Sequence, residues 1–164
     1  MNSHNRLVGP ALLLLLVVLV GCSGAFGIAI ETNPVDDTSV QTMLQYRDGR
    51  NTGPEYAVNL TVPDAWVGEF EAKTEGNKLV FERIKEIGAD TVTLTIEALS
   101  QSQYWKQVGS YPGDFTNILF TADTYFIYHV PPFASYLDLS GEEYTAFRAE
   151  IADIVQTLTV ERAG

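Results

Sequence analysis

Alternation of apolar and polar residues over short runs is the feature that most restricts how this 164-residue chain can fold. Residues 91–98 carry apolar side chains at every second position, with Thr or Glu between them. A period of two is typical of a β-strand with one buried face, so Glu97 and the threonines are expected to face outwards. The same alternation predicts a strand over residues 56–62, which Pro63 ends.

Four more strands follow from the same reasoning. Residues 69–74 and 78–84 flank Glu75-Gly76-Asn77, a sequence that favours a tight turn and therefore a hairpin. Residues 117–121 and 124–130 form a second pair, and the latter run is apolar on both faces, as in a central strand covered on both sides. Short connections predict antiparallel pairing, with residues 56–98 as a four-strand meander.

The clearest helix begins near residue 140. Ser140 and Glu143 have the spacing of a capping box, in which each side chain satisfies a backbone N–H of the other residue. Six apolar residues then recur at helical spacing: Tyr144, Phe147, Ile151, Ile154, Val155 and Leu158. Weaker patterns predict short helices over residues 39–46 and 102–108, and a closing strand over residues 157–160.

This order of elements predicts an α+β fold, with a mainly antiparallel sheet of about six strands and a long C-terminal amphipathic helix packed on it. The strand and helix pattern sharpens at residue 54, so we expect one domain over residues 54–164. The run Tyr56-x-Val58-x-Leu60-x-Val62-Pro63-x-x-Trp66 and the C-terminal Ile151-x-x-Ile154-Val155-x-Thr157-Leu158 resemble the PsbP-like α/β sandwich. That resemblance implies architecture alone, because the matching positions are structural.

The N-terminal segment has the order of a secretory signal. Arg6 precedes an apolar run over residues 11–20, and the small residue Gly21 stands before Cys22, the single cysteine of the chain. The apolar run is shorter than the roughly 20 residues that a membrane-spanning helix needs. Leu19-Val20-Gly21-Cys22 resembles the lipobox of bacterial lipoproteins. The resemblance implies a signal peptide over residues 1–21, cleavage after Gly21, and a diacylglyceryl group on the Cys22 thiol.

Two acyl chains hold a protein stably on a membrane, whereas one binds marginally. We therefore expect an exported chain anchored to a bacterial membrane, the cell or outer membrane, on its extracytoplasmic side. Residues 22–53, punctuated by Gly, Pro, Asn and Asp, are expected to form the lipidated N-terminus and a tether. The alternative for Cys22 is an ordinary small buried residue.

Charge excludes some partners. Ten Lys and Arg stand against 21 Asp and Glu, a net charge of −11. Nucleic-acid binding needs clustered cations, so no nucleic-acid partner is expected. The dispersed acids are typical of a soluble, self-repelling surface.

Catalytic and metal-binding patterns are sparse. His129 is the single histidine after the predicted cleavage site, and no sequence spacing links it to a nucleophile. The acid pairs Asp36-Asp37 and Glu142-Glu143 lack the surroundings of a calcium loop. The sequence therefore predicts no metal site and no cofactor.

Aromatic residues are dense between residues 104 and 136, and most of them are expected to build the core. Four that lie in predicted loops or in the short helix over residues 102–108 are candidates for a recognition surface: Trp105, Tyr111, Phe133 and Tyr136. Two functions stay open. The first is a non-catalytic binding or accessory module for an envelope protein or glycan, with an exposed aromatic surface. The second is an envelope-anchored hydrolase, with His129 in a cleft beside an acid such as Asp123 or Asp138.

Overall fold

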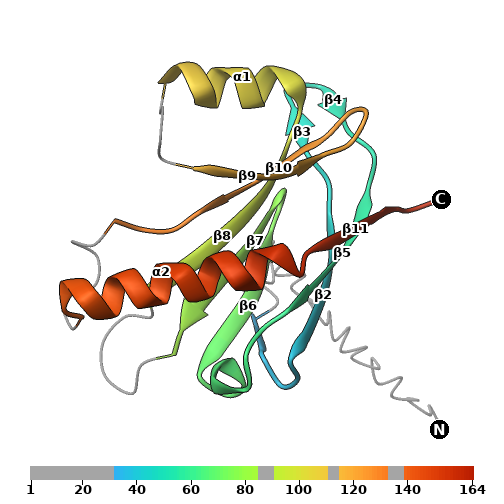
Figure 1. Cartoon of the computed structure of the whole chain (residues 1–164). Helices are drawn as coiled ribbons and strands as arrows, with labels where there is room; N and C mark the ends of the chain where they lie inside the picture. The colour runs from blue at the N-terminus through green and yellow to red at the C-terminus, as the bar shows by residue number, and fades with distance from the viewer. Residues whose placement is uncertain (1–31, 85–90, 111–114, 133–138) are drawn as a thin grey trace, which may run out of the picture.

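The computed structural model describes residues 32–84, 91–110, 115–132 and 139–164 (Figure 1). Two α-helices and eleven strands form the described fold, with a 3-10 turn at Asp64–Trp66 after β5. The helices are α1 (Gln101–Ser110) and α2 (Gly141–Gln156). The strands are β1 (Thr32–Pro34), β2 (Ser39–Leu44), β3 (Arg47–Asp48), β4 (Asn51–Thr52), β5 (Tyr56–Thr61), β6 (Phe70–Glu75), β7 (Lys78–Arg83), β8 (Thr91–Leu99), β9 (Thr116–Phe120), β10 (Tyr125–His129) and β11 (Thr159–Arg162). The expectation of an α+β fold with antiparallel sheets and a C-terminal helix is confirmed.

The sequence predicts one sheet of about six strands, but the strands form separate sheets. A six-stranded sheet has the order β1-β6-β7-β8-β10-β9, and a second sheet has the order β11-β5-β2. The predicted meander therefore begins at β6, because β5 pairs with β2 and β11 instead of β6. Alternation shows that β5 buries one face, but it carries no information about which strand lies beside it.

The N-terminal segment is the largest correction to the predicted organisation. Residues 39–44 form strand β2, so the predicted helix over 39–46 is wrong. Pairing with β5 sets Val40 opposite Leu60 and buries Leu44 completely. This tertiary pairing outweighs a weak helical spacing. The described part of the predicted tether, residues 32–53, is folded, since β1 also pairs with β6 and Val35 lies in the core.

The β6–β7 hairpin forms where the sequence predicts it. Glu75 pairs with Lys78 across the turn, and Gly76 has a φ of 64°, a conformation that costs glycine little. Strand β8 then pairs antiparallel with both β7 and β10. Strand β10 is covered on both faces, as its sequence indicates, because Phe126 and Ile127 point to opposite sides and neither is exposed.

The core lies between the inner faces of the two sheets and α2. The six-stranded sheet contributes Phe81, Leu94, Ile96 and Phe126, all fully buried. From the second sheet come Tyr56, Val58 and Leu60, and from α2 come Ile151, Ile154 and Val155. In Figure 1 helix α2 crosses in front of the sheets, and β11 continues from it toward the C-terminus.

Helix α2 begins at the predicted cap. The Glu143 backbone N–H donates to Ser140 Oγ at 3.3 Å, and the Ser140 N–H donates to a Glu143 carboxylate oxygen at 2.7 Å. Phe147 is only half-buried, whereas Ile151 is fully buried, so the buried stretch lies toward the C-terminal half of the helix. Neither described helix is long and apolar enough to cross a membrane.

Candidate binding surface

Helix α1 is held at one end of the six-stranded sheet. Ser100 Oγ accepts from the Gln103 N–H at 3.1 Å, and Gln103 Oε1 accepts from the Ser100 N–H at 2.9 Å, so the helix starts with its own capping box. The Ser100 hydroxyl also donates to Asp48 Oδ2 at 2.7 Å. Because Asp48 lies in β3, this contact ties the start of α1 to the β3–β4 hairpin.

A chain of aromatic contacts connects α1 with the β9–β10 hairpin. The ring of Tyr104 stacks on Tyr125 with centroids 4.3 Å apart and planes at 12°. Phe120 stacks on the same Tyr125 at 6.0 Å, and Phe115 lies at 6.0 Å from Tyr104. Five residues therefore form one connected group, which we call the aromatic surface: Tyr104, Trp105, Phe115, Phe120 and Tyr125.

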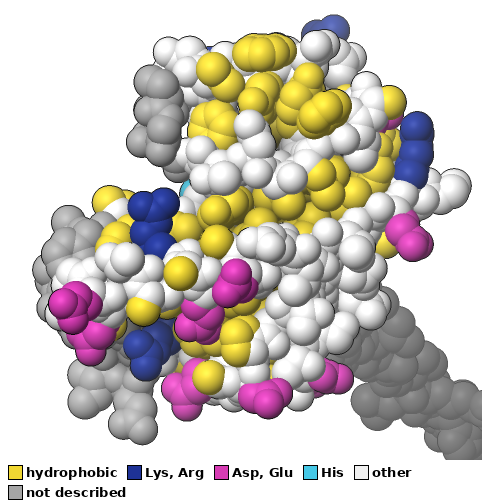
Figure 2. All heavy atoms as spheres, in the orientation of Figure 1, with side chains coloured by type: hydrophobic (Ala, Val, Ile, Leu, Met, Phe, Trp, Pro, Cys, Tyr) yellow, Lys and Arg dark blue, Asp and Glu magenta, His cyan; other side chains and the backbone are white. Residues whose placement is uncertain are grey.

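Two members of the aromatic surface face solvent. Trp105 is 57% exposed and Phe120 is 75% exposed, although both are large apolar side chains. Figure 2 shows hydrophobic side chains gathered over α1 and in a band between α1 and α2. Large exposed aromatic side chains that are held in place by stacked neighbours are characteristic of interaction sites, since they offer a partner apolar area in a fixed orientation.

The structure places one of the four predicted surface residues in this group. Trp105 is exposed, as the recognition interpretation requires. Tyr111, Phe133 and Tyr136 lie outside the described residues. Phe120 was missed because its strand was expected to be packed. Its local sequence did not indicate exposure, because alternation along a strand does not show which face is covered and β9 is the last strand of its sheet.

His129 lies beside an acid that sequence reasoning did not select. Its Nε2 is 3.4 Å from Oε2 of Glu97. The register makes them a diagonal pair across β8 and β10, because Glu97 stands opposite Ile127. Asp123, one suggested partner, lies instead in the β9–β10 turn and bonds Tyr56, while Asp138 is outside the described residues.

Glu97 is buried, with 7% of its surface exposed, and the expectation that it faces solvent is wrong. Side chains at the β6–β7 turn and the start of β7 contact it: Asn77 donates to Oε1 at 3.1 Å, and Lys78 Nζ lies 3.7 Å from that oxygen. Burial by itself would raise the pKa of Glu97, but the hydrogen bond from His129, the charge of Lys78 and the bond from Asn77 together lower it. Glu97 is therefore a carboxylate at neutral pH.

Two adjoining clefts open between the β9–β10 hairpin and α2. Their volumes are about 480 and 400 Å³, and both are lined by Thr116 and Tyr128, so they form one groove. Ile118, Leu119 and Val155 line one end, while His129 and Arg148 line the other. The groove thus has an apolar end and an end with a cationic side chain.

Within residues 32–84, 91–110, 115–132 and 139–164, no three His, Cys, Asp or Glu side chains are grouped as a metal site would require. Comparison of the chain with family models, with curated proteins and with solved structures gave no match.

Proposed function

We propose that this chain is a bacterial lipoprotein that serves as a non-catalytic binding or accessory module on the extracytoplasmic side of a membrane. In this proposal the signal peptide is removed after Gly21, and a diacylglyceryl group on Cys22 anchors the chain. Its partner is a protein or glycan of the cell envelope. We also propose that the sheets and α2 belong to a PsbP-like sandwich.

The observation that carries the binding proposal is the exposure of Trp105 and Phe120 on a stacked base. A side chain that only fills the core has no reason to remain more than half exposed. Burying such a ring at an interface contributes a favourable transfer free energy of about 25 cal/mol per Å² of apolar area, which offsets part of the cost of association. Tyr and Trp at recognition sites also lose little conformational entropy on binding.

Site-specific photocrosslinking tests this proposal in the producing cell. A photoreactive phenylalanine analogue placed at Trp105 or Phe120 should yield a discrete adduct. The same analogue at Met43, which is 41% exposed and lies in β2 of the other sheet, is the matched control. Equal labelling from all three positions, or none, would argue against a recognition surface at α1 and β9.

The anchor has an independent test. Wild-type protein should partition into the detergent phase after processing, because two acyl chains are buried there. Cys22→Ala should accumulate as an uncleaved precursor or as a form released into the aqueous phase. Recovery of mature wild-type protein in the aqueous phase would contradict the anchoring proposal and would leave the binding proposal standing.

The second candidate function, an envelope-anchored hydrolase, is favoured by one observation. His129 lines a cleft, and the Glu97 carboxylate 3.4 Å away is placed to orient the imidazole as a base for water. Hydrolysis of p-nitrophenyl esters by purified protein, abolished in His129→Gln and strongly reduced in Glu97→Gln, would support this candidate. Residual turnover equal in wild type and His129→Gln would eliminate it.

A further inference from the structure

Among the strands that the structure describes, β9 is an edge strand. It ends the six-stranded sheet, and no other described strand pairs with its outer side. Exposed edges are usually protected by a charged residue or a proline, because their free N–H and C=O groups recruit other strands. The sequence of β9, Thr-Asn-Ile-Leu-Phe, contains neither. This edge is therefore chemically suited to accept another strand.

Helix α2 provides a wall beside that edge. Tyr144, Arg148, Ala152 and Gln156 recur at every fourth position, so they lie in one row along the helix, and all four line the groove. The methyl group of Ala152 leaves the middle of that row open. At 1.5 Å per residue the row is about 18 Å long. The five residues of β9 span about 17 Å, so edge and wall match over their length.

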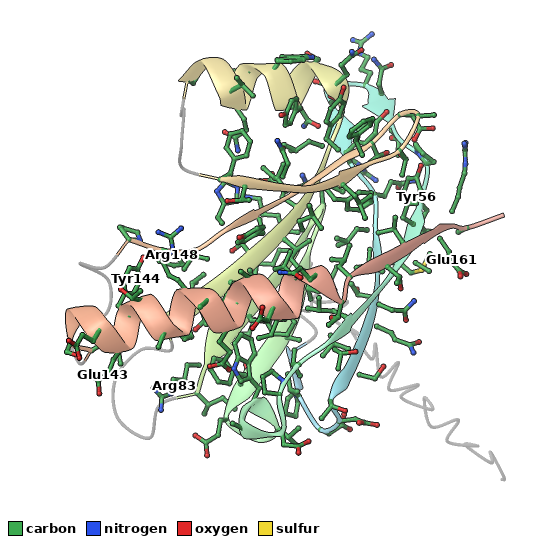
Figure 3. The ribbon with its side chains drawn as sticks, in the orientation of Figure 1. Tyr56, Arg83, Glu143, Tyr144, Arg148 and Glu161 are labelled. Atoms are coloured by element: carbon green, nitrogen blue, oxygen red, sulfur yellow. The ribbon has the colours of Figure 1, made fainter. Side chains whose placement is uncertain are left out.

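Arg148 supplies charge at one end of the groove. In Figure 3 Arg148 and Tyr144 both extend from α2 toward the segment that follows β10. The Tyr144 hydroxyl donates to the carbonyl of Pro131 at 2.8 Å, which closes this end. Within the described ranges Arg148 forms no ion pair, whereas Lys73, Lys78 and Arg162 each do. An anionic group from outside is the complementary ligand.

We propose that the groove between β9 and α2 binds an extended peptide segment of a partner protein, which adds as a strand to the β9 edge. The peptide's apolar side chains enter the groove over Ala152, and a carboxylate, from an acidic residue or a C-terminus, pairs with Arg148. Strand addition takes its affinity from main-chain hydrogen bonds and its specificity from pockets for alternate side chains. This inference rests on the proposed function and names the partner's chemistry.

Two other occupants satisfy fewer of these features. An acyl chain fills apolar space, but it has no N–H or C=O for the β9 backbone. A second copy of β9 offers a strand, but residues 116–120 bring no carboxylate for Arg148. An extended peptide with an acidic group satisfies the edge, the wall and the cation together.

The test uses full-length protein in mild detergent and a displayed library of random decapeptides with free C-termini. We expect enriched sequences with apolar residues at alternate positions and a carboxylate near one end. The tightest binder is then resynthesised with N-methyl groups at alternate residues. Two peptides are compared, one methylated at odd-numbered and one at even-numbered residues. The series that removes the N–H groups facing β9 should weaken binding more than about tenfold, while the other series should change it by less than about twofold.

Variants of the protein test the wall and the cation. Arg148→Gln should weaken the selected peptide about tenfold, and Arg83→Gln, on β7 and away from the groove, is its control. Ala152→Phe should abolish binding by filling the groove, whereas Ala149→Phe, on the exposed side of α2, should not. Circular dichroism establishes that each variant is folded, and the N-methyl series needs no variant.

Absence of enrichment, or N-methyl effects without a two-residue period, would overturn the proposal. So would a peptide-free dimer in sedimentation equilibrium that the selected peptide does not dissociate, because the edge would then belong to a second copy. Palmitate that displaces the peptide, and whose own binding is weakened as much as the peptide's by Arg148→Gln, would assign the groove to an amphiphile. That result would also overturn the proposal. The photocrosslinking at Trp105 is independent, so either inference can fail alone.

Discussion

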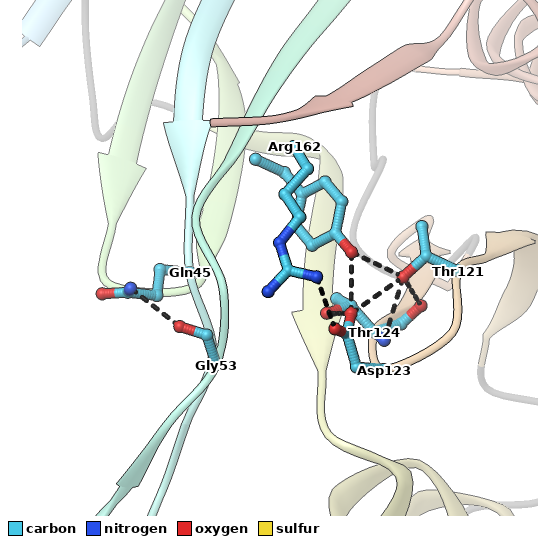
Figure 4. Close-up of polar contacts among 7 residues, drawn as sticks. Gln45, Gly53, Thr121, Asp123, Thr124 and Arg162 are labelled. Carbon is cyan, nitrogen blue, oxygen red and sulfur yellow. Dashed lines mark hydrogen bonds and ion pairs between the residues drawn. The ribbon is translucent and has the colours of Figure 1, made fainter. Parts of the chain in front are cut away.

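The hydroxyl of Tyr56 donates a 2.7 Å hydrogen bond to Oδ1 of Asp123, and this contact links β5 of one sheet to the β9–β10 turn of the other (Figure 4). Thr121 and Thr124 bond the same oxygen, at 3.2 Å each, and Arg162 reaches the second oxygen at 3.4 Å. One carboxylate therefore joins β5, β11 and the hairpin that carries Phe120.

Removing the Tyr56 hydroxyl should destabilise the fold. Tyr56 is 4% exposed, so Tyr56→Phe leaves the ring packed. The substitution removes two hydrogen bonds of the hydroxyl, the one to Asp123 Oδ1 and a second, of 2.8 Å, with Thr121 Oγ1. We expect a loss of about 1–2 kcal/mol in the free energy of unfolding, as for hydrogen bonds to charged groups. Tyr125→Phe is the control, with a change of less than about 0.5 kcal/mol. Urea titration measures both, and equal losses would contradict the linking role.

Asp123 should make stability depend on pH. The hydrogen bond from Tyr56, followed by those from Thr121 and Thr124 and the charge of Arg162, holds the pKa of Asp123 below its usual value despite partial desolvation. The Asp123 carboxylate therefore binds a proton more tightly in the unfolded chain than in the folded one. Its contribution to the free energy of unfolding is complete above about pH 4 and is lost as the pH falls through the pKa of the folded state. The difference in urea midpoint between wild type and Asp123→Asn should be present at pH 7 and narrow by pH 3. A constant difference would rule out ionisation as its source.

The two tryptophans should respond in opposite ways. Trp66 is 2% exposed, stacks on Phe70 at 4.1 Å and donates to Glu150 at 3.0 Å. Trp66→Ala should therefore cost about 3–5 kcal/mol. Trp105→Ala should change stability by less than about 0.5 kcal/mol, because that side chain is exposed. Thermal unfolding measures both changes. A large loss of stability in Trp105→Ala would show that Trp105 is part of the core and would contradict its exposed position.

Helix α2 gives a graded series. Ser140→Ala should cost about 1 kcal/mol through loss of the cap, and Ile151→Ala about 2–5 kcal/mol through a cavity. Phe147→Ala should cost less than Ile151→Ala, since Phe147 is half-buried. Denaturant midpoints give the order, and a Phe147 effect above that of Ile151 would contradict the packing of this helix.

Truncation tests the corrected N-terminal boundary. A chain that starts at residue 53 lacks β2, which leaves one side of β5 unpaired and removes the fully buried Leu44. We expect it to show no cooperative thermal transition, whereas a chain that starts at residue 31 should unfold cooperatively. Cooperative unfolding of the shorter chain near the full-length midpoint would show that β2 is dispensable.

Local pattern was sufficient for elements whose signal lies within a few residues. The capping box at Ser140, the turn at Gly76 and the two-sided burial of β10 all follow from neighbouring side chains and backbone preferences. For the site, local pattern identified Trp105 as a candidate but not Phe120, because the exposure of Phe120 depends on β9 being the last strand of its sheet.

The sequence by itself determined the strands from residue 56 onward and helix α2, since alternation with period two and recurrence at helical spacing are set by neighbours along the chain. Tertiary structure alone decided which strands pair and that residues 39–44 form a strand instead of a helix. It also decided that Glu97 lies in contact with His129. The physical reason is that a strand leaves its backbone bonds to be made by another segment, and the free energy of that choice depends on residues far away in sequence.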